Sequence, residues 1–279
     1  MRFSEELWSG GFPVAIEITP PQANRRRVLL RRASMLGEAA CAVNVIQRPE
    51  RMSSLDASIE LVAEGLDPVW HLVTKGRTRD EVAADLAHAA GAGIACVLCV
   101  RGDHALADRD DTPTVRDAVA MAVERMPGAL IGATASQYGE RGAVLKNLFP
   151  KLAAGARYVQ TQPVFAYEQL RPLAEAVKER SPETAIVAMA MPLTTQDAIE
   201  RIPVRLGLSL PEGLAEDFAS NGEESGWARF ADTWAELVAS PLVDGVAVMT
   251  FEMDATPAFA ERLRGVIARA PRPVRERPG

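Results

Sequence analysis

Residues 94–103 read Ile94-Ala95-Cys96-Val97-Leu98-Cys99-Val100-Arg101-Gly102-Asp103, and this stretch shows the unit that we expect to build the whole chain. Its first seven residues are apolar without a break, which is typical of a β-strand buried on both faces. The segment 82–90 before it has apolar residues at three- and four-residue spacing, which indicates an amphipathic helix. A helix therefore leads into a buried strand, and the strand ends in polar residues.

The same unit recurs along the chain. Further short apolar runs lie at Val14–Thr19, Ala42–Ile46, Val69–Thr74, Leu130–Ala135, Tyr158–Val164, Ala185–Met191 and Val246–Phe251. Between the runs lie segments with helical spacing, at Val28–Leu36, Leu55–Ala63, Val115–Val123, Ala143–Ala153 and Leu170–Val177. Strict alternation of strands and helices indicates parallel strands joined by right-handed crossovers. Eight repeats in about 250 residues match the size of a (β/α)8 TIM barrel, so we predict one such α/β domain over residues 1–279.

Residues suited to helix capping support several of these helices. Ser53-Ser54 precedes Leu55, Thr78 precedes Arg79, and Thr112 precedes Pro113. Serine and threonine at such positions satisfy the free N–H groups of a first helical turn. We therefore expect helices to begin at these three places.

The segment before the last strand is longer than the others. Between Ile202 and Asp244 it holds Pro203, Pro211 and a polar stretch, and then helical spacing returns at Trp227–Val238. We expect an inserted helix there, before the last helix and strand. The tail at about 271–279 has no core-forming pattern, so we expect it to fray.

Composition limits the class of protein. The net charge is -6, and no apolar run approaches the ~18 residues of a membrane span. The N-terminus includes Glu5 and Glu6 within its first six residues and lacks the apolar stretch of a secretory signal, so we expect a cytoplasmic protein with no membrane partner. The arginine clusters Arg25–Arg27 and Arg31-Arg32 fall on a predicted helix, and we interpret them as a solvated face rather than a nucleic-acid site.

The cysteines and histidines do not predict a metal centre. Cys96 and Cys99 have C-x-x-C spacing, but residues three apart on a strand face opposite ways and cannot chelate one ion. Three dispersed histidines add no zinc set. Glycine-rich nucleotide-binding motifs of the Rossmann or P-loop kind are also missing from the sequence.

Glu17 is the most informative residue, because it stands between Ile16 and Ile18 in an apolar strand. In a barrel of this kind, catalytic residues lie at the carboxyl ends of the strands. Burial there raises the pKa of a carboxyl group, as a general acid requires near neutral pH. A structural carboxylate paired with a barrel arginine is an equally good interpretation.

Other strand ends carry polar residues with more than one interpretation. Asp103 could stabilise a developing cation or cap a loop, and His71 could contact a cofactor or be a core histidine. The amide of Gln162 is suited to recognising the edge of a heterocycle. Lys75 and Lys151 lie outside the strand cores, which argues against a Schiff-base aldolase.

Taken in order, these motifs resemble the methylenetetrahydrofolate reductase family, which are flavin-dependent barrels. The family carries E-F-F-P-P, H-L-T and L-R-G-D on strands one, three and four. This chain has Glu17-Ile18-Thr19-Pro20-Pro21, His71-Leu72-Val73-Thr74 and Val100-Arg101-Gly102-Asp103. The family's K-x-x-A-G-A and T-Q patterns are matched by Lys151–Ala156 and Thr161-Gln162, and the likeness covers about residues 12–195.

The resemblance implies an oxidoreductase of one-carbon metabolism and methionine biosynthesis that reduces 5,10-methylenetetrahydrofolate to 5-methyltetrahydrofolate, with FAD as cofactor and NAD(P)H as reductant. Glu17 would be the acid, and Asp103 would stabilise the iminium ion and tune the flavin. Gln162 and Phe165 would contact the substrate. The flavin site would comprise His71, Arg101, Gly102, Asp103, Ser136 and Lys151. The sequence allows a homo-oligomer. It does not distinguish NADH from NADPH as the reductant, or folate from another pterin as the substrate.

The chain also departs from the family pattern. The loop Ser136–Arg141 lacks the proline and histidine that hold the flavin in the family. Pro150 and Met253 each occupy a position where an arginine is common in the family. The loop Ala105–Thr112 lacks the expected aromatic residue. The alternatives are therefore a flavin-free or partner-dependent pterin reductase, a non-catalytic pterin- or flavin-binding barrel, and an unrelated barrel lyase. Glu17 and Asp103 argue against the non-catalytic alternative.

Overall fold

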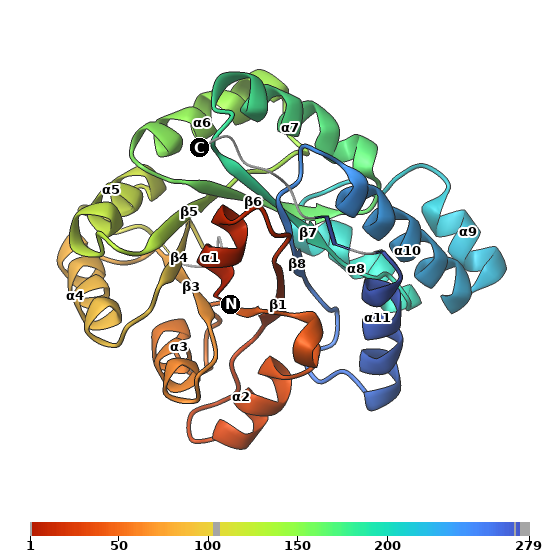
Figure 1. Ribbon diagram of the computed structural model, residues 1–279, viewed down its shortest axis with the longest axis horizontal. Helices are drawn as coiled ribbons and strands as arrows, with labels where there is room; N and C mark the ends of the chain where they lie inside the picture. The colour runs from red at the N-terminus through yellow and green to blue at the C-terminus, as the bar shows by residue number, and fades with distance from the viewer. Residues whose placement is uncertain (1, 103–106, 271, 274–279) are drawn as a thin grey trace.

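The computed structural model describes residues 2–102, 107–270 and 272–273, and these form a closed barrel of parallel strands. The strands are β1 (Val14–Ile18), β2 (Ala42–Val45), β3 (Pro68–Val73), β4 (Cys96–Val100), β5 (Leu130–Thr134), β6 (Tyr158–Val164), β7 (Ala185–Ala190) and β8 (Gly245–Val248). Each strand pairs with the next, and β8 pairs with β1 to close the ring. Figure 1 looks along the barrel, with helices surrounding the strands. The predicted (β/α)8 fold is confirmed.

The strands are shorter than predicted at some ends. β4 begins at Cys96 rather than Ile94, and β8 ends at Val248 rather than Phe251. Met249 still donates its backbone N–H to the Ala190 oxygen at 2.9 Å, after which the chain leaves the ladder. Thr250 and Phe251 therefore belong to the loop at the mouth.

Helices alternate with the strands as predicted. They are α2 (Arg26–Ala33), α3 (Ser54–Ala63), α4 (Arg79–Gly91), α5 (Val115–Arg125), α6 (Arg141–Ala153), α7 (Tyr167–Arg180) and α11 (Pro257–Arg269). The predicted caps Ser53 and Thr78 accept N–H groups from Asp56 and Glu81. The prediction for Thr112 is wrong, because Thr114 caps α5 and Thr112 instead accepts the Arg109 N–H at 2.8 Å.

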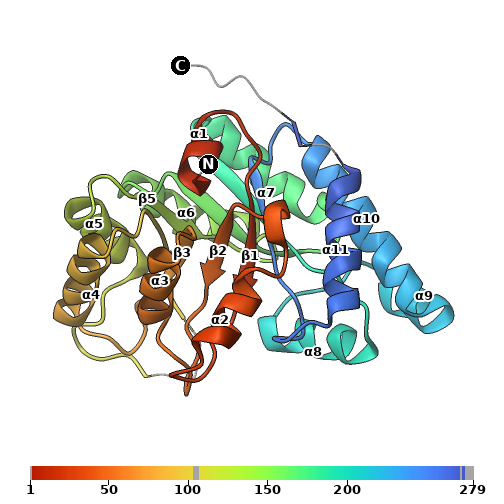
Figure 2. The same cartoon turned by 60° about the horizontal axis from the view of Figure 1, so that its bottom comes forward.

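The amino-terminal end of the barrel is sealed by α1 (Phe3–Trp8), which the apolar pattern did not reveal. Phe3 and Leu7 pack against interior strand residues such as Val69 and Tyr158. In Figure 2, α1 lies at the end from which the strands start, and α8 (Gln196–Leu206) lies at the opposite end. Ligands therefore have access from the carboxyl ends of the strands.

The apolar core has two layers, one inside the barrel and one between the strands and the helices. Cys96 belongs to the inner layer and Cys99 to the layer beneath α4 and α5, so the predicted opposite orientation is confirmed. Trp227 and Trp234 fill the outer layer below α10 (Glu223–Ala239). Among the described residues, no helix has the length and apolar character that crossing a membrane requires.

The segment between β7 and β8 holds more than the expected inserted helix. It contains α8, α9 (Leu214–Asn221) and α10, and α10 begins at Glu223 within the stretch interpreted as polar. Pro203 lies inside α8 without ending it, and the helix stops at Gly207, where φ is +61°. The predicted fraying tail lies outside the described residues except for 272–273, and there Arg272 donates to the Ala39 oxygen.

Candidate active site

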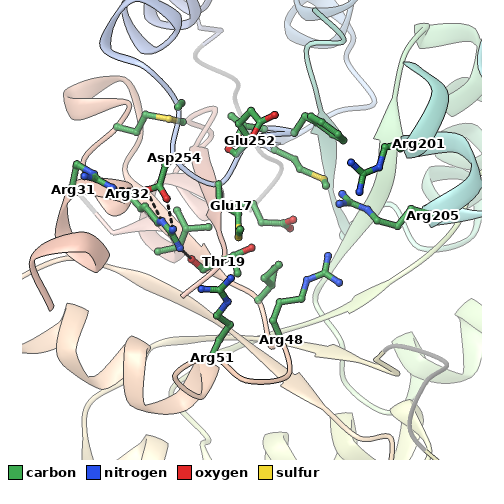
Figure 3. Close-up of a pocket in the computed structure, with 18 of the residues that line it drawn as sticks. Glu17, Thr19, Arg31, Arg32, Arg48, Arg51, Arg201, Arg205, Glu252 and Asp254 are labelled. Atoms are coloured by element: carbon green, nitrogen blue, oxygen red, sulfur yellow. Dashed lines mark hydrogen bonds and ion pairs between the residues drawn. The ribbon is translucent and has the colours of Figure 1, made fainter. Parts of the chain in front are cut away.

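A cavity of about 410 Å³ opens at the carboxyl end of the barrel, beside β1, β2 and β8. Its lining combines Glu17 with side chains from α2, from the loop after β2, from α8 and from the segment after β8. Most of the charged residues in this lining are arginines, as Figure 3 shows. The cavity therefore places one strand carboxylate among several guanidinium groups.

Glu17 faces this cavity because its neighbours on β1 face the other way. Ile16 and Ile18 pack in the outer apolar layer, so the alternation of the strand turns Glu17 inward. Burial raises the pKa of Glu17 to about 7, and the positive charges of Arg48 and Arg205 oppose that rise. Glu17 therefore has the raised pKa expected of a general acid, and it also has arginines nearby, as expected of a structural carboxylate.

A polar layer lies beneath the mouth. Asn44, the β2 register partner of Glu17, donates its side-chain amide to Gln160 Oε1 on β6 at 2.8 Å. His71 on β3 is buried, and burial lowers its pKa to about 3, so its imidazole is neutral. The Asn44 Oδ1 and His71 Nε2 atoms have no hydrogen-bond partner among the described residues. Buried polar atoms of this kind are candidates for ligand contact.

Sequence reasoning missed Asn44 and Gln160. Both interrupt apolar runs, and Gln160 stands two residues before Gln162 on the same strand. Period-two alternation along β6 was the available signal, because it turns Tyr158 and Gln160 to the same face.

Arg32 on α2 links the segment after β8 to the residue that follows β1. Its Nε and Nη2 atoms donate to the two carboxylate oxygens of Asp254 at 3.1 and 2.6 Å, and its Nη1 donates to the Thr19 oxygen at 2.7 Å. Arg31 donates to the same carboxylate. The interpretation of this arginine cluster as a solvated face is therefore wrong for Arg32, which is only 7% exposed.

A second cavity of about 790 Å³ lies beside the ends of β4 and β5. Its basic lining residues are Arg101, Arg109, Arg116, Lys146 and Lys151. Lys151 is nearly buried, donates to the Thr134 oxygen at 3.0 Å, and has its pKa lowered by burial. Gly102 has φ +94°, which favours glycine. Asp103 lies outside the described residues.

The loop Ser136–Arg141 is fixed to the end of β6. Gln137 donates its amide to the Gln162 oxygen at 3.0 Å and accepts the Gln162 N–H at 3.2 Å. Tyr138 donates its hydroxyl to the Pro163 oxygen at 2.5 Å, and Ser136 Oγ accepts the Tyr138 N–H. The pairing of β6 with β7 shifts register between Gln160 and Pro163, so Gln162 lies within an irregular part of the ladder.

The predicted site residues are therefore brought to one end of the barrel but not into one cavity. Glu17 lines the first cavity, and Arg101 and Lys151 line the second. Ser136, Gln162 and Phe165 line neither, and Phe165 is buried in an apolar cluster with Met189 and Met191.

The second cavity has features that fit FAD, the cofactor suggested by the sequence. Its lining carries five basic side chains, of which Arg101 pairs with Asp108 and Arg109 pairs with Glu81. Arg and Lys are the usual ligands of phosphate groups. On and just after the neighbouring strand β3, His71 Nε2 and Thr74 Oγ1 are buried without a hydrogen-bond partner among the described residues, although neither residue lines this cavity. Among the described residues, no cluster of three or more His, Cys, Asp or Glu could hold a metal ion.

Comparison with known proteins gives a family and a fold. A family model described as methylenetetrahydrofolate reductase matches residues 2–258, whereas no curated protein matches. An uncharacterized protein from Clostridium thermocellum that binds two copies of 5-methyl-5,6,7,8-tetrahydrofolic acid has a similar structure, with TM-score 0.71 and 14% identity over 95% of this chain and 96% of that one. Coenzyme F420-dependent tetrahydromethanopterin reductase from Methanopyrus kandleri has TM-score 0.58 and 12% identity over 92% and 99%.

Proposed function

The chain belongs to the methylenetetrahydrofolate reductase family, and we propose that it reduces 5,10-methylenetetrahydrofolate to 5-methyltetrahydrofolate with NAD(P)H through bound FAD. The observation that carries this proposal is Glu17, an inward carboxyl group in an open cavity with a pKa of about 7. The two structural neighbours bind or reduce reduced pterins, which supports the same class of substrate here.

Glu17 would supply the proton that the reaction requires. Opening the five-membered ring breaks a bond between the methylene carbon and a nitrogen, and protonation of that nitrogen makes it a leaving group. Because burial raises the pKa of Glu17 to about 7, its protonated form is accessible near neutral pH. Once it has given up its proton, the Glu17 carboxylate remains beside the cationic iminium and stabilises it.

The chain's other residues would position the reactants. When bound, FAD would supply the hydride-transfer chemistry that links NAD(P)H to the folate. Arg101, Arg109 and Lys146 would hold the diphosphate in the second cavity. Gln162, whose backbone is fixed by Gln137, would recognise the edge of the pterin, and Asp103 would stabilise the cation. The neutral His71 would offer a hydrogen bond rather than a charge.

One observation favours a second candidate, a flavin-free reductase in which the hydride passes directly from NAD(P)H. The family holds its flavin with the loop after strand five, and here Gln137 and Tyr138 of that loop use their side chains to bind the β6 backbone. Because these two side chains already form hydrogen bonds with β6, the loop offers fewer polar groups to a cofactor. The rest of the proposal, including the acid Glu17, is the same for both candidates.

The test is the purified full-length protein, measured by absorbance and by turnover. Flavin absorbance together with reduction of methylenetetrahydrofolate by NAD(P)H is the result expected for the main proposal. A colourless protein that does not bind added FAD but reduces the folate would establish the flavin-free candidate. If the protein produced no 5-methyltetrahydrofolate either with or without added FAD, the proposed activity would be wrong.

A further inference from the structure

The interior of the barrel carries a polar bridge between opposite strands. Asn44 on β2 and Gln160 on β6 are each 1% exposed, and Asn44 Nδ2 donates to Gln160 Oε1 at 2.8 Å. Because β2 and β6 lie across the closed ring of strands from each other, this hydrogen bond spans the interior. Branched apolar side chains usually fill such positions, and burying an amide costs free energy unless it is paired. The roles proposed above use neither amide.

The pairing of the strands places Asn44 beside Glu17 and slightly below it. The two residues are register partners on β1 and β2, and neighbouring strands run about 4.8 Å apart. In a barrel of this kind the level rises by about one residue from each strand to the next, and alternate strands fill alternate layers. Glu17 and His71 therefore share the layer at the mouth, and Asn44 and Gln160 belong to the layer directly beneath it.

Gln160 fixes the direction in which the Asn44 amide points. With Nδ2 donating to Gln160, the Oδ1 atom lies on the other side of the amide, where it is buried and has no hydrogen-bond partner among the described residues. A buried acceptor without a donor is costly. An ionised carboxylate offers only acceptors, whereas a protonated carboxyl group has an O–H to donate. Of the two forms of Glu17, only the protonated one can satisfy this atom.

We propose that Asn44, oriented by Gln160, is a positioning residue whose Oδ1 accepts the O–H of Glu17 and so keeps the acid protonated until the substrate binds. This inference rests on the proposed function for the use of that proton. When the ring opens, the proton passes from Glu17 to the substrate nitrogen and the carboxylate remains, so the step needs no further reactant.

This hydrogen bond acts together with burial and against the cations of the first cavity. Burial raises the pKa of Glu17 to about 7, and the charges of Arg48 and Arg205 oppose that rise. An acceptor that bonds only the neutral form acts in the same direction as burial. The buried imidazole of His71 is neutral, and the other charged groups that line the cavity are Arg31, Arg32, Arg51, Asp197, Arg201, Glu252 and Asp254.

Infrared titration of the full chain measures the protonation of Glu17 directly. The carbonyl stretch of its protonated form is identified as the band that is missing from Glu17→Gln. In Asn44→Leu we expect this band to titrate about one pH unit lower, the roughly tenfold effect of one lost hydrogen bond, and to move to a higher frequency. If the amide only filled space, leucine would make the surroundings of Glu17 more apolar and would raise its pKa instead.

Two further variants keep the test decisive if Asn44→Leu does not fold. Gln160→Met releases Asn44 Nδ2, which can then turn toward the carboxylate, so the pKa of Glu17 should fall here too. Asn44→Asp keeps an acceptor but adds a negative charge, so the pKa should rise. Leu98→Met changes the shape of the same interior layer without a polar group, and this matched control should leave the titration unchanged. Circular dichroism shows which variants are folded.

The inference is overturned if Glu17 titrates at the same pH in the wild type, Asn44→Leu and Gln160→Met, if its pKa rises in Asn44→Leu, or if Leu98→Met lowers it equally. Failure of the proposed function is a separate outcome, because the infrared titration needs no turnover. A protein that reduces methylenetetrahydrofolate with a titration insensitive to Asn44 keeps its function and loses this hydrogen bond. A protein whose Glu17 responds to Asn44 but that makes no 5-methyltetrahydrofolate keeps the hydrogen bond and loses the function.

Discussion

Arg32 on α2 and Asp254 after β8 form a two-point ion pair, with donor–acceptor distances of 3.1 and 2.6 Å, although 222 residues separate them in the sequence. The pair holds the final loop of the barrel against the end of β1, because Arg32 also donates to the Thr19 oxygen. This loop carries Glu252 into the wall of the cavity that contains Glu17. The helix α2 and the loop after β8 therefore shape the mouth together.

Replacing Asp254 by Asn should destabilise the fold and loosen this loop. Breaking a buried ion pair costs about 3–5 kcal/mol, but Asp254 is 48% exposed, so we expect about 1–2 kcal/mol. Arg32 and Arg31 lower the pKa of Asp254 to about 2. The pair's contribution is complete above the unfolded value of ~3.9 and disappears as the pH falls through about 2. Urea unfolding at pH 7 measures the loss, and an equal loss in the exposed control Asp232→Asn would contradict it.

Gly132 on β5 is required by the barrel interior. A Cβ atom there would lie 2.2 Å from Cε1 of Tyr158, a fully buried ring on the adjacent strand. We expect Gly132→Ala to destabilise the protein by about 1–3 kcal/mol, as overpacking does. Gly265→Ala on α11 is the matched control, because nothing lies within 4 Å of its Cβ, and it should stabilise by about 0.5–1 kcal/mol. Denaturant midpoints compare the two, and equal midpoints would exclude this packing explanation.

Most of the fold could be predicted because the strands are buried on both faces. A run such as Tyr158–Val164 needs no knowledge of its neighbours to be recognised as a buried strand, and its limits are as predicted. The helix α8 was harder to predict, since Pro203 indicates a break, whereas the helix continues to Leu206 with Ile199 and Ile202 packed in an apolar cluster. The short helix α1 carries only two buried residues, too few for a periodic pattern.

The site could be predicted only in part. The inward direction and raised pKa of Glu17 follow from its place in an apolar strand, which is local information. The arginines around it could not be foreseen, because Arg48 and Arg205 are 157 positions apart in numbering and meet only through closure of the barrel. Arg32 was assigned to a solvated face for the same reason, since its partner Asp254 lies at the other end of the chain.

Glu17→Gln is expected to abolish most folate reduction while leaving the reductant step intact. General acid catalysis contributes about 10²–10⁴-fold, so kcat/KM for methylenetetrahydrofolate should fall within that range. Oxidation of NAD(P)H with an artificial electron acceptor should be unchanged if FAD is bound. Steady-state and stopped-flow kinetics measure the two steps separately.

The matched control for this variant is Glu179→Gln on the exposed end of α7, which should keep full activity. Folate reduction by Glu17→Gln at the wild-type rate would remove the acid role. A parallel loss of both steps would indicate a structural defect instead, which circular dichroism would reveal.

The pH dependence provides a test of Glu17 that needs no assumption about the cofactor. Burial raises its pKa to about 7 against the usual ~4.3, so the folded chain binds more protons than the unfolded chain between these values. Stability from this group is therefore complete below about pH 4 and is lost as the pH rises through about 7. The activity should decline over the same upper range, because the acid must be protonated. Melting temperatures from pH 5 to 8 should fall more in the wild type than in Glu17→Gln, and parallel curves would show that Glu17 does not titrate there.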